Sequence, residues 1–249
     1  MRTTIIVPCY NEEKRLPLDK FKQFVQKYPD CSLLFVNDGS KDNTLTILNG
    51  LAKEHQAINV LDLLQNAGKA EAVRQGMLHA INTHPVPDFV AFYDADMATP
   101  ASDLYAMIQL ADNQQYHMVV ASRILRLGGA IDRTFIRGIM GRVFANAASY
   151  VLCNLTVYDT QCGAKVFRAP VAQVIFAKPF ITNWIFDVEL FARMIIQYGL
   201  QEVYMKVYEF PLSAWRDVQG SKVSKMDFIR QIYDMYKIKK HYKLSCKKK

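Results

Sequence analysis

Two aspartates separated by a single residue follow a short apolar run and could bind a divalent cation. Asp94 and Asp96 come directly after the run FVAFY at 89–93. Carboxylates at positions i and i+2 can meet at one cation as the chain turns, and Mg²⁺ or Mn²⁺ favours such oxygen ligands together with substrate phosphates. A solvated turn before a helix is the alternative. The position of the pair at the end of an apolar run adds weight to the metal site, and both interpretations stay open at this point.

Two other polar turns could bind a nucleoside. Asp38, in the Asn-Asp-Gly-Ser turn at 37–40, could accept hydrogen bonds from a base or a ribose. It could also cap the helix that follows, which is the more frequent role of such a turn in isolation. The segment PCYNEE at 8–13 has the same two interpretations, and its Tyr10 could stack on a base. Both turns are therefore candidate nucleotide-binding segments.

The segment NAGK at 66–69 could bind a phosphate at the start of a helix. Gly68 permits close approach of the backbone, and Lys69 could reach the phosphate. The segment lacks the upstream glycine of a Walker A loop, and no G-x-G-x-x-G pattern occurs in the chain, which disfavours an NAD enzyme. Arginines that could clamp a diphosphate occur at 123, 133, 137, 142 and 216, although most surface arginines have no such role.

These polar segments follow apolar runs that we expect to form a mostly parallel sheet. The expected strands are 4–8, 32–36, 58–63, 89–93 and 118–121, and the expected helices are 16–28, 42–55, 68–82 and 102–113. Strands and helices that alternate at this spacing indicate an α/β fold. In such sheets ligands bind beyond the carboxyl ends of the strands. The polar clusters lie at those ends, at 11–12, 37–38, 66–69, 94–96 and 122–123.

The second half of the chain is less regular. A helix-like segment spans 131–152, turn residues and a short apolar strand occupy 156–167, a helix is expected at 186–197 and a strand at 203–210. Residues 226–242 have the pattern of an amphipathic helix that runs into a lysine-rich tail. We therefore divide the chain into a domain at 1–225 and a basic amphipathic helix with its tail at 226–249.

Length, charge and cysteine content exclude several classes of protein. The chain has 249 residues, of which 51% are apolar and 22% charged, enough for the core of one α/β domain. Its net charge is +8, but seven lysines lie at 237–249, so the body lacks the basic face of a nucleic-acid-binding protein. The five cysteines have no C-x-x-C spacing, which disfavours a structural zinc site or a disulfide framework.

Taken together, the motifs resemble those of family 2 glycosyltransferases with the GT-A fold, over residues 3–225. The segments that carry the resemblance are VPCYNEE (7–13), FVNDGSKDNT (35–44), NAGKAEAVRQGM (66–77), YDADMATP (93–100), ASR (121–123), DTQCGAKVF (159–167), WIFDVELF (184–191) and WRDVQGSKV (215–223). The last three resemble most specifically the polyprenyl-phosphate glycosyltransferases, which include dolichyl-phosphate glucosyltransferases and mannose synthases.

The resemblance implies inverting transfer of a sugar from a nucleotide diphosphosugar to a lipid phosphate. Asp96 would be the main protein ligand of Mg²⁺ or Mn²⁺, and Asp94 would lie near the ribose and the metal. The residues that would hold the nucleotide are Pro8, Tyr10, Glu12 and Asp38, in addition to Lys69 at the phosphate.

Basic residues would bind the phosphates of both substrates. By the same resemblance, Arg123 and Arg137 would bind a donor or acceptor phosphate, and Arg216 and Lys222 would close over the diphosphate. A phosphate monoester is already mostly ionised near neutral pH, so the lack of an obvious catalytic histidine fits this reaction.

Several alternatives for donor and acceptor remain open. Ala98 stands where mannose synthases of this group often carry Gln, which favours glucose from UDP-glucose over GDP-mannose. Asp187 and Glu189 would lie near the sugar, or else would be a helix cap and a surface charge. A polysaccharide or another soluble hydroxyl as acceptor would need one of these two as a general base. An inactive protein that binds sugar nucleotides and a membrane is the non-enzymatic alternative.

Membrane contact is expected at the protein surface rather than through a spanning helix. No stretch approaches the roughly 20 apolar residues that a spanning helix needs. Two segments, 131–158 and 226–242, could instead lie on anionic lipid, and each lysine of the tail would add roughly 1 kcal/mol. Their apolar residues are Phe135, Ile139, Met140, Val143 and Phe144, and Phe228, Ile232, Met235 and Tyr236. These features predict a peripheral enzyme on the cytoplasmic face of a membrane, unless both helices pack on the core.

Overall fold

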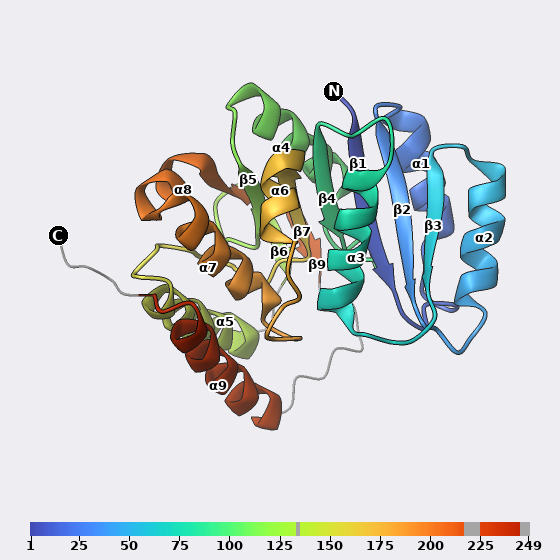
Figure 1. The fold of residues 1–249 in the computed structure, drawn as a ribbon. Coiled ribbons are helices and arrows are strands. Elements are labelled where there is room, and N and C mark those ends of the chain that lie inside the picture. The colour runs from blue at the N-terminus through green and yellow to red at the C-terminus, as the bar shows by residue number, and fades with distance from the viewer. Residues whose placement is uncertain (133–134, 217–224, 245–249) are drawn as a thin grey trace.

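The computed structural model describes residues 1–132, 135–216 and 225–244, and it has the predicted α/β architecture (Figure 1). Its main sheet has seven strands in the order β3-β2-β1-β4-β7-β5-β8. β7 runs antiparallel to β4 and β5, and the other neighbours pair in parallel. The strands are β1 (Thr3–Cys9), β2 (Cys31–Asp38), β3 (Ile58–Leu63), β4 (Phe89–Tyr93), β5 (Met118–Ser122), β7 (Ala164–Arg168) and β8 (Val207–Pro211).

Helices cover both faces of this sheet. α1 (Leu18–Lys27), α2 (Thr44–Glu54) and α4 (Ala101–Asn113) contribute to the core on one face. α3 (Lys69–Asn82), α6 (Ala169–Ile175) and α7 (Phe186–Tyr198) contribute to the core on the other. Successive side chains of a strand point to opposite faces, so Ile5 and Ile6 belong to different cores. This burial on both sides explains why the strands are continuous apolar runs in the sequence.

Helices α5 (Phe135–Val151) and α9 (Lys225–His241) pack together below the sheet in Figure 1. The helix predicted at 131–152 begins later, because β6 (Ala130–Asp132) pairs with β9 (Ala214–Arg216). In the described ranges, no helix combines the length and the apolar character needed to cross a membrane.

Two residues expected at a membrane surface are buried instead. Phe144 of α5 is 9% exposed and Met235 of α9 is 2% exposed. Both belong to the core that joins these helices to the sheet, so they stabilise the packing of α5 and α9. The side chains of Phe135 and Phe228 fall outside the described residues.

The strand predicted at 203–210 is wrong over its first half. Helix α8 (Leu200–Lys206) occupies that half, and β8 begins at Val207. Gly199 ends α7 with a φ of 84°, and its carbonyl accepts a hydrogen bond from the N–H of Val203 (3.1 Å), which starts a new helical turn. The mixed residues of this segment have no clear period, so the sequence could not distinguish the two structures.

Parallel pairing brings the carboxyl ends of β1, β2 and β4 to one edge of the sheet. The register places Cys9 opposite Asn37 and Ile6 opposite Phe92. The polar segments that follow these strands therefore emerge side by side, at the edge where the sequence predicts the ligand.

Candidate active site

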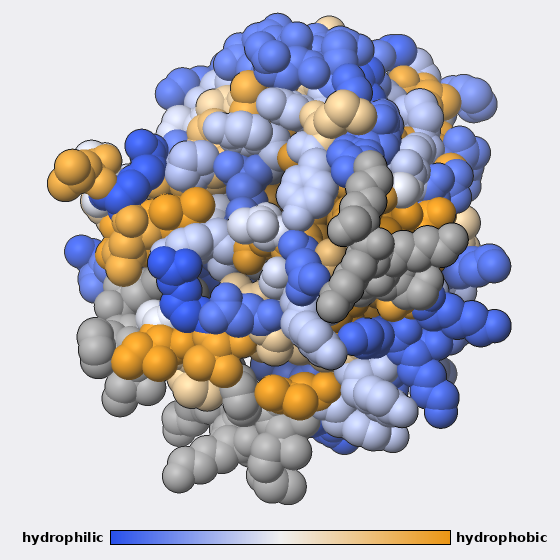
Figure 2. Space-filling model, turned by 90° about the vertical axis from the view of Figure 1, so that its left-hand side faces the viewer, coloured by the Kyte–Doolittle hydropathy of each residue, from blue (hydrophilic) through white to orange (hydrophobic). Residues whose placement is uncertain are grey.

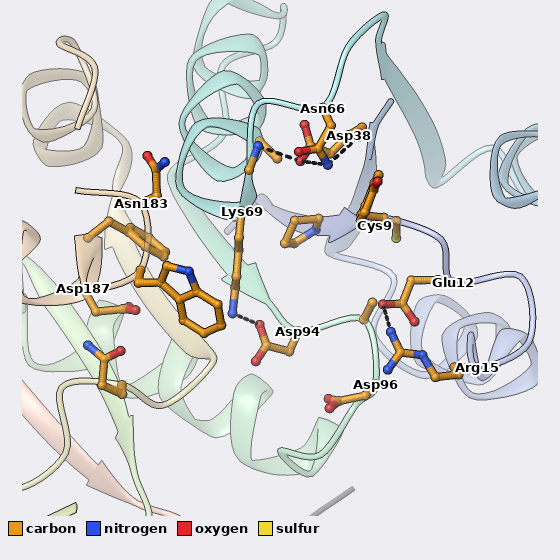
Figure 3. A pocket seen from close by; sticks show the side chains of 18 residues that line it. Cys9, Glu12, Arg15, Asp38, Asn66, Lys69, Asp94, Asp96, Asn183 and Asp187 are labelled. Carbon is orange, nitrogen blue, oxygen red and sulfur yellow. Dashed lines mark hydrogen bonds and ion pairs between the residues drawn. The ribbon is translucent and has the colours of Figure 1, made fainter. Parts of the chain in front are cut away.

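A cavity of about 640 Å³ opens at this edge of the sheet (Figure 3). Its walls are the segments after β1, β2 and β4, the start of α3, and the start of α7 from the second half of the chain. The predicted site residues that line it are Pro8, Tyr10, Glu12, Asp38, Lys69, Asp94, Asp96 and Asp187. Side chains far apart in the sequence therefore meet in one cavity.

Asp94 and Asp96 form a tight acidic turn on the cavity wall. The N–H of Asp94 donates to the carbonyl of Gly163 (2.9 Å), and the N–H of Ala98 donates to Oδ1 of Asp96 (3.0 Å). Met97 follows with a φ of 51°, in the left-handed region. This turn brings both carboxylates to the cavity.

Gly163, between β7 and the preceding loop, leaves room for the Asp94 carboxylate. A Cβ atom at position 163 would lie 1.7 Å from Oδ2 of Asp94 and 2.2 Å from its Cγ. Any side chain at this position would displace the carboxylate. The glycine is thus required by an aspartate in the turn that follows β4.

The acidic turn fits a divalent cation that arrives with phosphate ligands. Burial raises the pKa of Asp96, and the nearby Asp94 carboxylate raises it too, so a cation would relieve an unfavourable concentration of negative charge. Among the described residues, no group of three or more His, Cys, Asp or Glu side chains is placed to hold a metal ion. Two carboxylates would leave the remaining coordination to substrate oxygens, which Mg²⁺ and Mn²⁺ accept.

Lys69 places a positive charge among the cavity carboxylates. Its Nζ lies 2.5 Å from Oδ1 of Asp94, and Figure 3 shows its side chain between Asp187 and Asp94. Desolvation lowers the pKa of Lys69, but Asp94, Asp187 and Asp96 outweigh this effect and raise it overall. Lys69 is also the first residue of α3, where backbone N–H groups favour an anion. The charged lysine can therefore balance either the carboxylates or a bound phosphate.

Asp38 shapes the loop in front of Lys69. Its carboxylate accepts hydrogen bonds from the N–H groups of Ala67 (2.8 Å) and Gly68 (2.9 Å) and from the Asn66 amide (3.1 Å). Gly39 has a φ of +61°, and a Cβ atom there would lie 2.4 Å from the backbone nitrogen of Asn66. Asp38 thus lines the cavity with its oxygens engaged by the loop.

Glu12 and Arg15 form an ion pair at the end of β1, on the same side of the cavity as Asp38. Nη2 of Arg15 lies 2.7 Å from Oε1 of Glu12. Burial raises the pKa of Glu12, and the Asp96 carboxylate contributes to the rise, whereas Arg15 opposes it. Tyr10, on the same wall, is 41% exposed and available for stacking. Sequence reasoning missed Arg15, whose spacing of three residues from Glu12 was the available signal.

The pattern of glycosyl transferase family 2 matches residues 4–176 of the chain. This chain belongs to that family. It is therefore a glycosyltransferase, and its sheet and flanking helices have the GT-A fold.

Relatives of this glycosyltransferase match nearly its whole length. Dolichyl-phosphate beta-glucosyltransferase ALG5D of Trichomonas vaginalis is 32% identical over an alignment of 260 residues, gaps included. The alignment covers 97% of this chain and 74% of the relative. The dolichyl-phosphate beta-glucosyltransferase of Drosophila melanogaster is 32% identical over 241 residues, with 90% and 70% covered. The crystal structure of glucosyl-3-phosphoglycerate synthase from Mycobacterium tuberculosis with UDP is similar at a TM-score of 0.67 and 15% identity, with 96% and 80% covered.

In this glycosyltransferase, Asp187 and Glu189 lie on different sides of α7. Asp187 lines the cavity, whereas Glu189 does not. Glu189 is fully buried and accepts hydrogen bonds from Arg193 (2.8 Å) and from the hydroxyl of Tyr242 (2.6 Å). Residues two apart on a helix point in different directions. Glu189 is therefore not a surface charge and does not line the cavity, whereas Asp187 does.

Arg123 is held at the end of β5 by an aspartate. Its Nε and Nη2 donate to the two oxygens of Asp159 at 2.6 and 2.8 Å, and its guanidinium lies 5.1 Å from the Trp215 ring centroid. Burial lowers the pKa of Arg123, but Asp159 outweighs it and raises the pKa. Arg123 does not line the cavity. The side chain of Arg137, on α5, and the whole of Lys222 fall outside the described residues.

A second hollow, of about 700 Å³, borders the same acidic turn. Met97 and Ala98 line it, together with Trp215 and Arg216 of β9. Arg216 is exposed, and its Nε lies 3.6 Å from Oδ2 of Asp132. The structure therefore places Arg216 beside the acidic turn but outside the main cavity.

Sequence reasoning missed three side chains at the α7 end of the cavity, Gln161, Asn183 and Trp184. Trp184 is 57% exposed, which is unusual for a large aromatic residue. The amide nitrogen of Gln161 is buried and has no hydrogen-bond partner among the described residues. These residues lie in turns, where spacing does not reveal the direction of a side chain. A tryptophan in a polar turn was the available signal.

Proposed function

We propose that this glycosyltransferase transfers glucose from UDP-glucose to a polyprenyl phosphate, with inversion at the anomeric carbon. The observation that carries the proposal is that Asp94, Asp96 and Lys69 meet in one cavity, between the segments that follow β1 and β2 and Asp187 of α7. The relatives named dolichyl-phosphate beta-glucosyltransferase support the sugar and the acceptor. The synthase with the same fold was crystallised with Mn²⁺ and UDP-glucose, which supports the nucleotide and a divalent metal.

The cavity offers a separate place for each part of the donor. The uridine would lie along Pro8–Glu12 and the loop braced by Asp38, with Tyr10 as its stacking surface. The diphosphate would lie at Lys69 and the acidic turn, and the glucose would lie at the α7 end.

The leaving diphosphate is the group that the site must stabilise. Lys69 supplies a fixed positive charge beside it, at the start of α3. Asp96, together with Asp94, would hold Mg²⁺ or Mn²⁺, which when bound neutralises charge on the diphosphate. The residues of the chain thus act by positioning and by electrostatics.

The geometry favours an acceptor that is already ionised. Oδ1 of Asp187 lies 2.5 Å from the buried ammonium of Lys165, and this positive charge opposes protonation of the carboxylate, which disfavours Asp187 as a general base. A phosphate monoester needs no such base near neutral pH. The second hollow, with Arg216 at its wall, is where such a phosphate would approach the acidic turn.

The test is transfer from labelled UDP-glucose or GDP-mannose to a short polyprenyl phosphate. We expect glycolipid from UDP-glucose with Mg²⁺ or Mn²⁺ and none after addition of EDTA. Product from GDP-mannose alone would overturn the donor. Product that forms only on a soluble hydroxyl acceptor would overturn the acceptor, and transfer that persists in EDTA would overturn the metal.

The α5–α9 pair is the surface that would meet the membrane. Ile139, Met140 and Val143 of α5 are 49%, 40% and 47% exposed, and Tyr233 and Tyr236 of α9 are 58% and 60% exposed. Figure 2 shows apolar residues on the lower part of this face, at the height of α5 and α9 in Figure 1. Lysines follow at the end of α9. Exposed apolar and aromatic residues beside lysines favour an anionic lipid surface.

The double substitution Ile139→Ser/Val143→Ser is expected to weaken vesicle binding about ten-fold or more, because two partly exposed apolar side chains are lost from the contact. Co-flotation with vesicles that contain phosphatidylserine measures the effect. Ile196→Ser is the matched control, since Ile196 is 57% exposed on α7. If the double variant floats like the unchanged protein, α5 is not the contact surface.

A further inference from the structure

A fully buried lysine joins two walls at the α7 end of the cavity. Lys165, on β7, is 0% exposed, and its Nζ lies 5.1 Å from the centroid of the Phe92 ring. Its Nζ donates to the carbonyl of Cys162 (2.8 Å) and to Oδ1 of Asp187 (2.5 Å). A buried ammonium is costly unless it is paired, so these partners hold it in one position.

Both partners of this ammonium belong to segments that face the cavity. Asp187 lines the cavity from the first turn of α7, and no other donor to its carboxylate is recorded within the described ranges. Cys162 follows Gln161, whose buried amide nitrogen has no partner in the described part of the chain. The position of Lys165 therefore fixes Asp187 on the cavity wall and holds the loop that contains Gln161.

The same end of the cavity carries an exposed aromatic ring. Trp184 precedes Asp187 by three residues and lines the cavity with 57% of its surface exposed. An aromatic face, a carboxylate and an amide are together suited to a hexose, whose ring has an apolar face and whose hydroxyls both donate and accept hydrogen bonds. A diphosphate would instead be repelled by the carboxylate.

We propose that Lys165 is a positioning residue for the sugar of the donor: it fixes Asp187 as a hydroxyl acceptor and holds the Cys162 loop against the same end of the cavity. This inference rests on the proposed function and assigns the hexose end of its site. Lys165 does not touch the nucleotide or the reacting atoms. Its removal should affect the sugar and spare the nucleoside diphosphate.

The first test compares Lys165→Met with the unchanged enzyme, using calorimetric affinities for UDP and for UDP-glucose. We expect UDP to bind within about two-fold of normal, and UDP-glucose to bind about ten-fold more weakly or worse, because hydrogen bonds to a charged group are lost. Equal weakening of both ligands would overturn the proposal. If the unchanged enzyme uses GDP-mannose, the donor assignment fails, and the same comparison is made with GDP and GDP-mannose. The proposal would also be overturned if the unchanged enzyme bound no nucleotide sugar more tightly than the corresponding nucleoside diphosphate.

The pH profile separates positioning from simple packing. Burial raises the pKa of Asp187, and Lys165 opposes that rise, as does Lys69 of α3, whereas Asp94 adds to it. Without Lys165, the pKa of Asp187 rises further, so UDP-glucose binding by Lys165→Met should recover as the pH is raised from 6 to 9. Asp187→Asn should bind UDP-glucose weakly at every pH. A pH-independent loss in Lys165→Met would overturn the role assigned to the lysine.

Two further variants keep the test valid if Lys165→Met unfolds. Lys165→Met/Asp187→Asn removes both charges and should fold, because no buried charge is left unpaired. It should bind UDP normally and UDP-glucose weakly, and normal UDP-glucose binding would overturn the proposal. Glu189→Gln is the matched control, since it alters another buried acid on α7 that does not line the cavity. Glu189→Gln should lower the melting temperature, but it should leave the ratio of the affinities for UDP and UDP-glucose unchanged.

Discussion

Asp96→Asn is expected to lower glucosyl transfer about 10²–10³-fold or more while the fold keeps its stability. The substitution removes the charge that would hold a divalent cation at the acidic turn. It keeps an oxygen that can accept the hydrogen bond from the N–H of Ala98 (3.0 Å). Because burial and Asp94 both raise the pKa of Asp96, the neutral side chain also relieves repulsion in the free enzyme. Activity and stability should therefore change independently.

Transfer from labelled UDP-glucose to a short polyprenyl phosphate measures the activity, and thermal unfolding measures the stability. Asp19→Asn is the control, since Asp19 is an exposed carboxylate on α1, away from the cavity. We expect Asp96→Asn to unfold at the same temperature as the unchanged enzyme, or slightly higher. Near-normal transfer by this variant would refute the assignment of Asp96 to the metal and the diphosphate.

Gly163→Ala is expected to lower transfer about 10²-fold, although it adds only a methyl group outside the cavity. The new Cβ would lie 1.7 Å from Oδ2 of Asp94, so the carboxylate must rotate away. Gly163 does not have a positive φ, so its backbone accepts alanine without strain. A displacement of the order of 1 Å at a reacting site is enough for a loss of this size.

The kinetic comparison should include Asp94→Asn alone and in combination with Gly163→Ala. If the glycine acts through Asp94, the double variant is no worse than Asp94→Asn, because both changes remove the same interaction. Gly50→Ala is the control: a Cβ there meets nothing within 4 Å, and α2 lies away from the cavity. Additive losses in the double variant, or full activity of Gly163→Ala, would contradict this role for the glycine.

Strands β1, β2, β4 and β5 were predictable because each is an apolar run with a polar turn at its end. Buried parallel strands need apolar residues on both faces, so the runs around Ile6, Val36 and Phe92 identify β1, β2 and β4 directly. The segment at 203–210 lacked such a run, and only packing decided that Gly199 ends one helix and that Val203 is buried in the next. The strand prediction at 203–210 failed because the local pattern does not show which residues the packing of the helices buries.

Helix faces were less predictable than helix positions. The amphipathic pattern located α9 but placed Met235 at the surface, whereas the contact with the core buries it. On α7, Asp187 and Glu189 were equivalent in the sequence. The structure separates them, because one turns to the cavity and the other to Arg193 and Tyr242.

The sequence by itself determined the family, the α/β class and the acidic turn, because each depends on residue types at short spacing. Only the tertiary structure decided which side chains act together. Gly163 contacts Asp94, which follows β4, and Lys165 of β7 joins the nearby Cys162 to Asp187 of α7. Such contacts depend on how the sheet and helices pack, and local spacing carries no information about them.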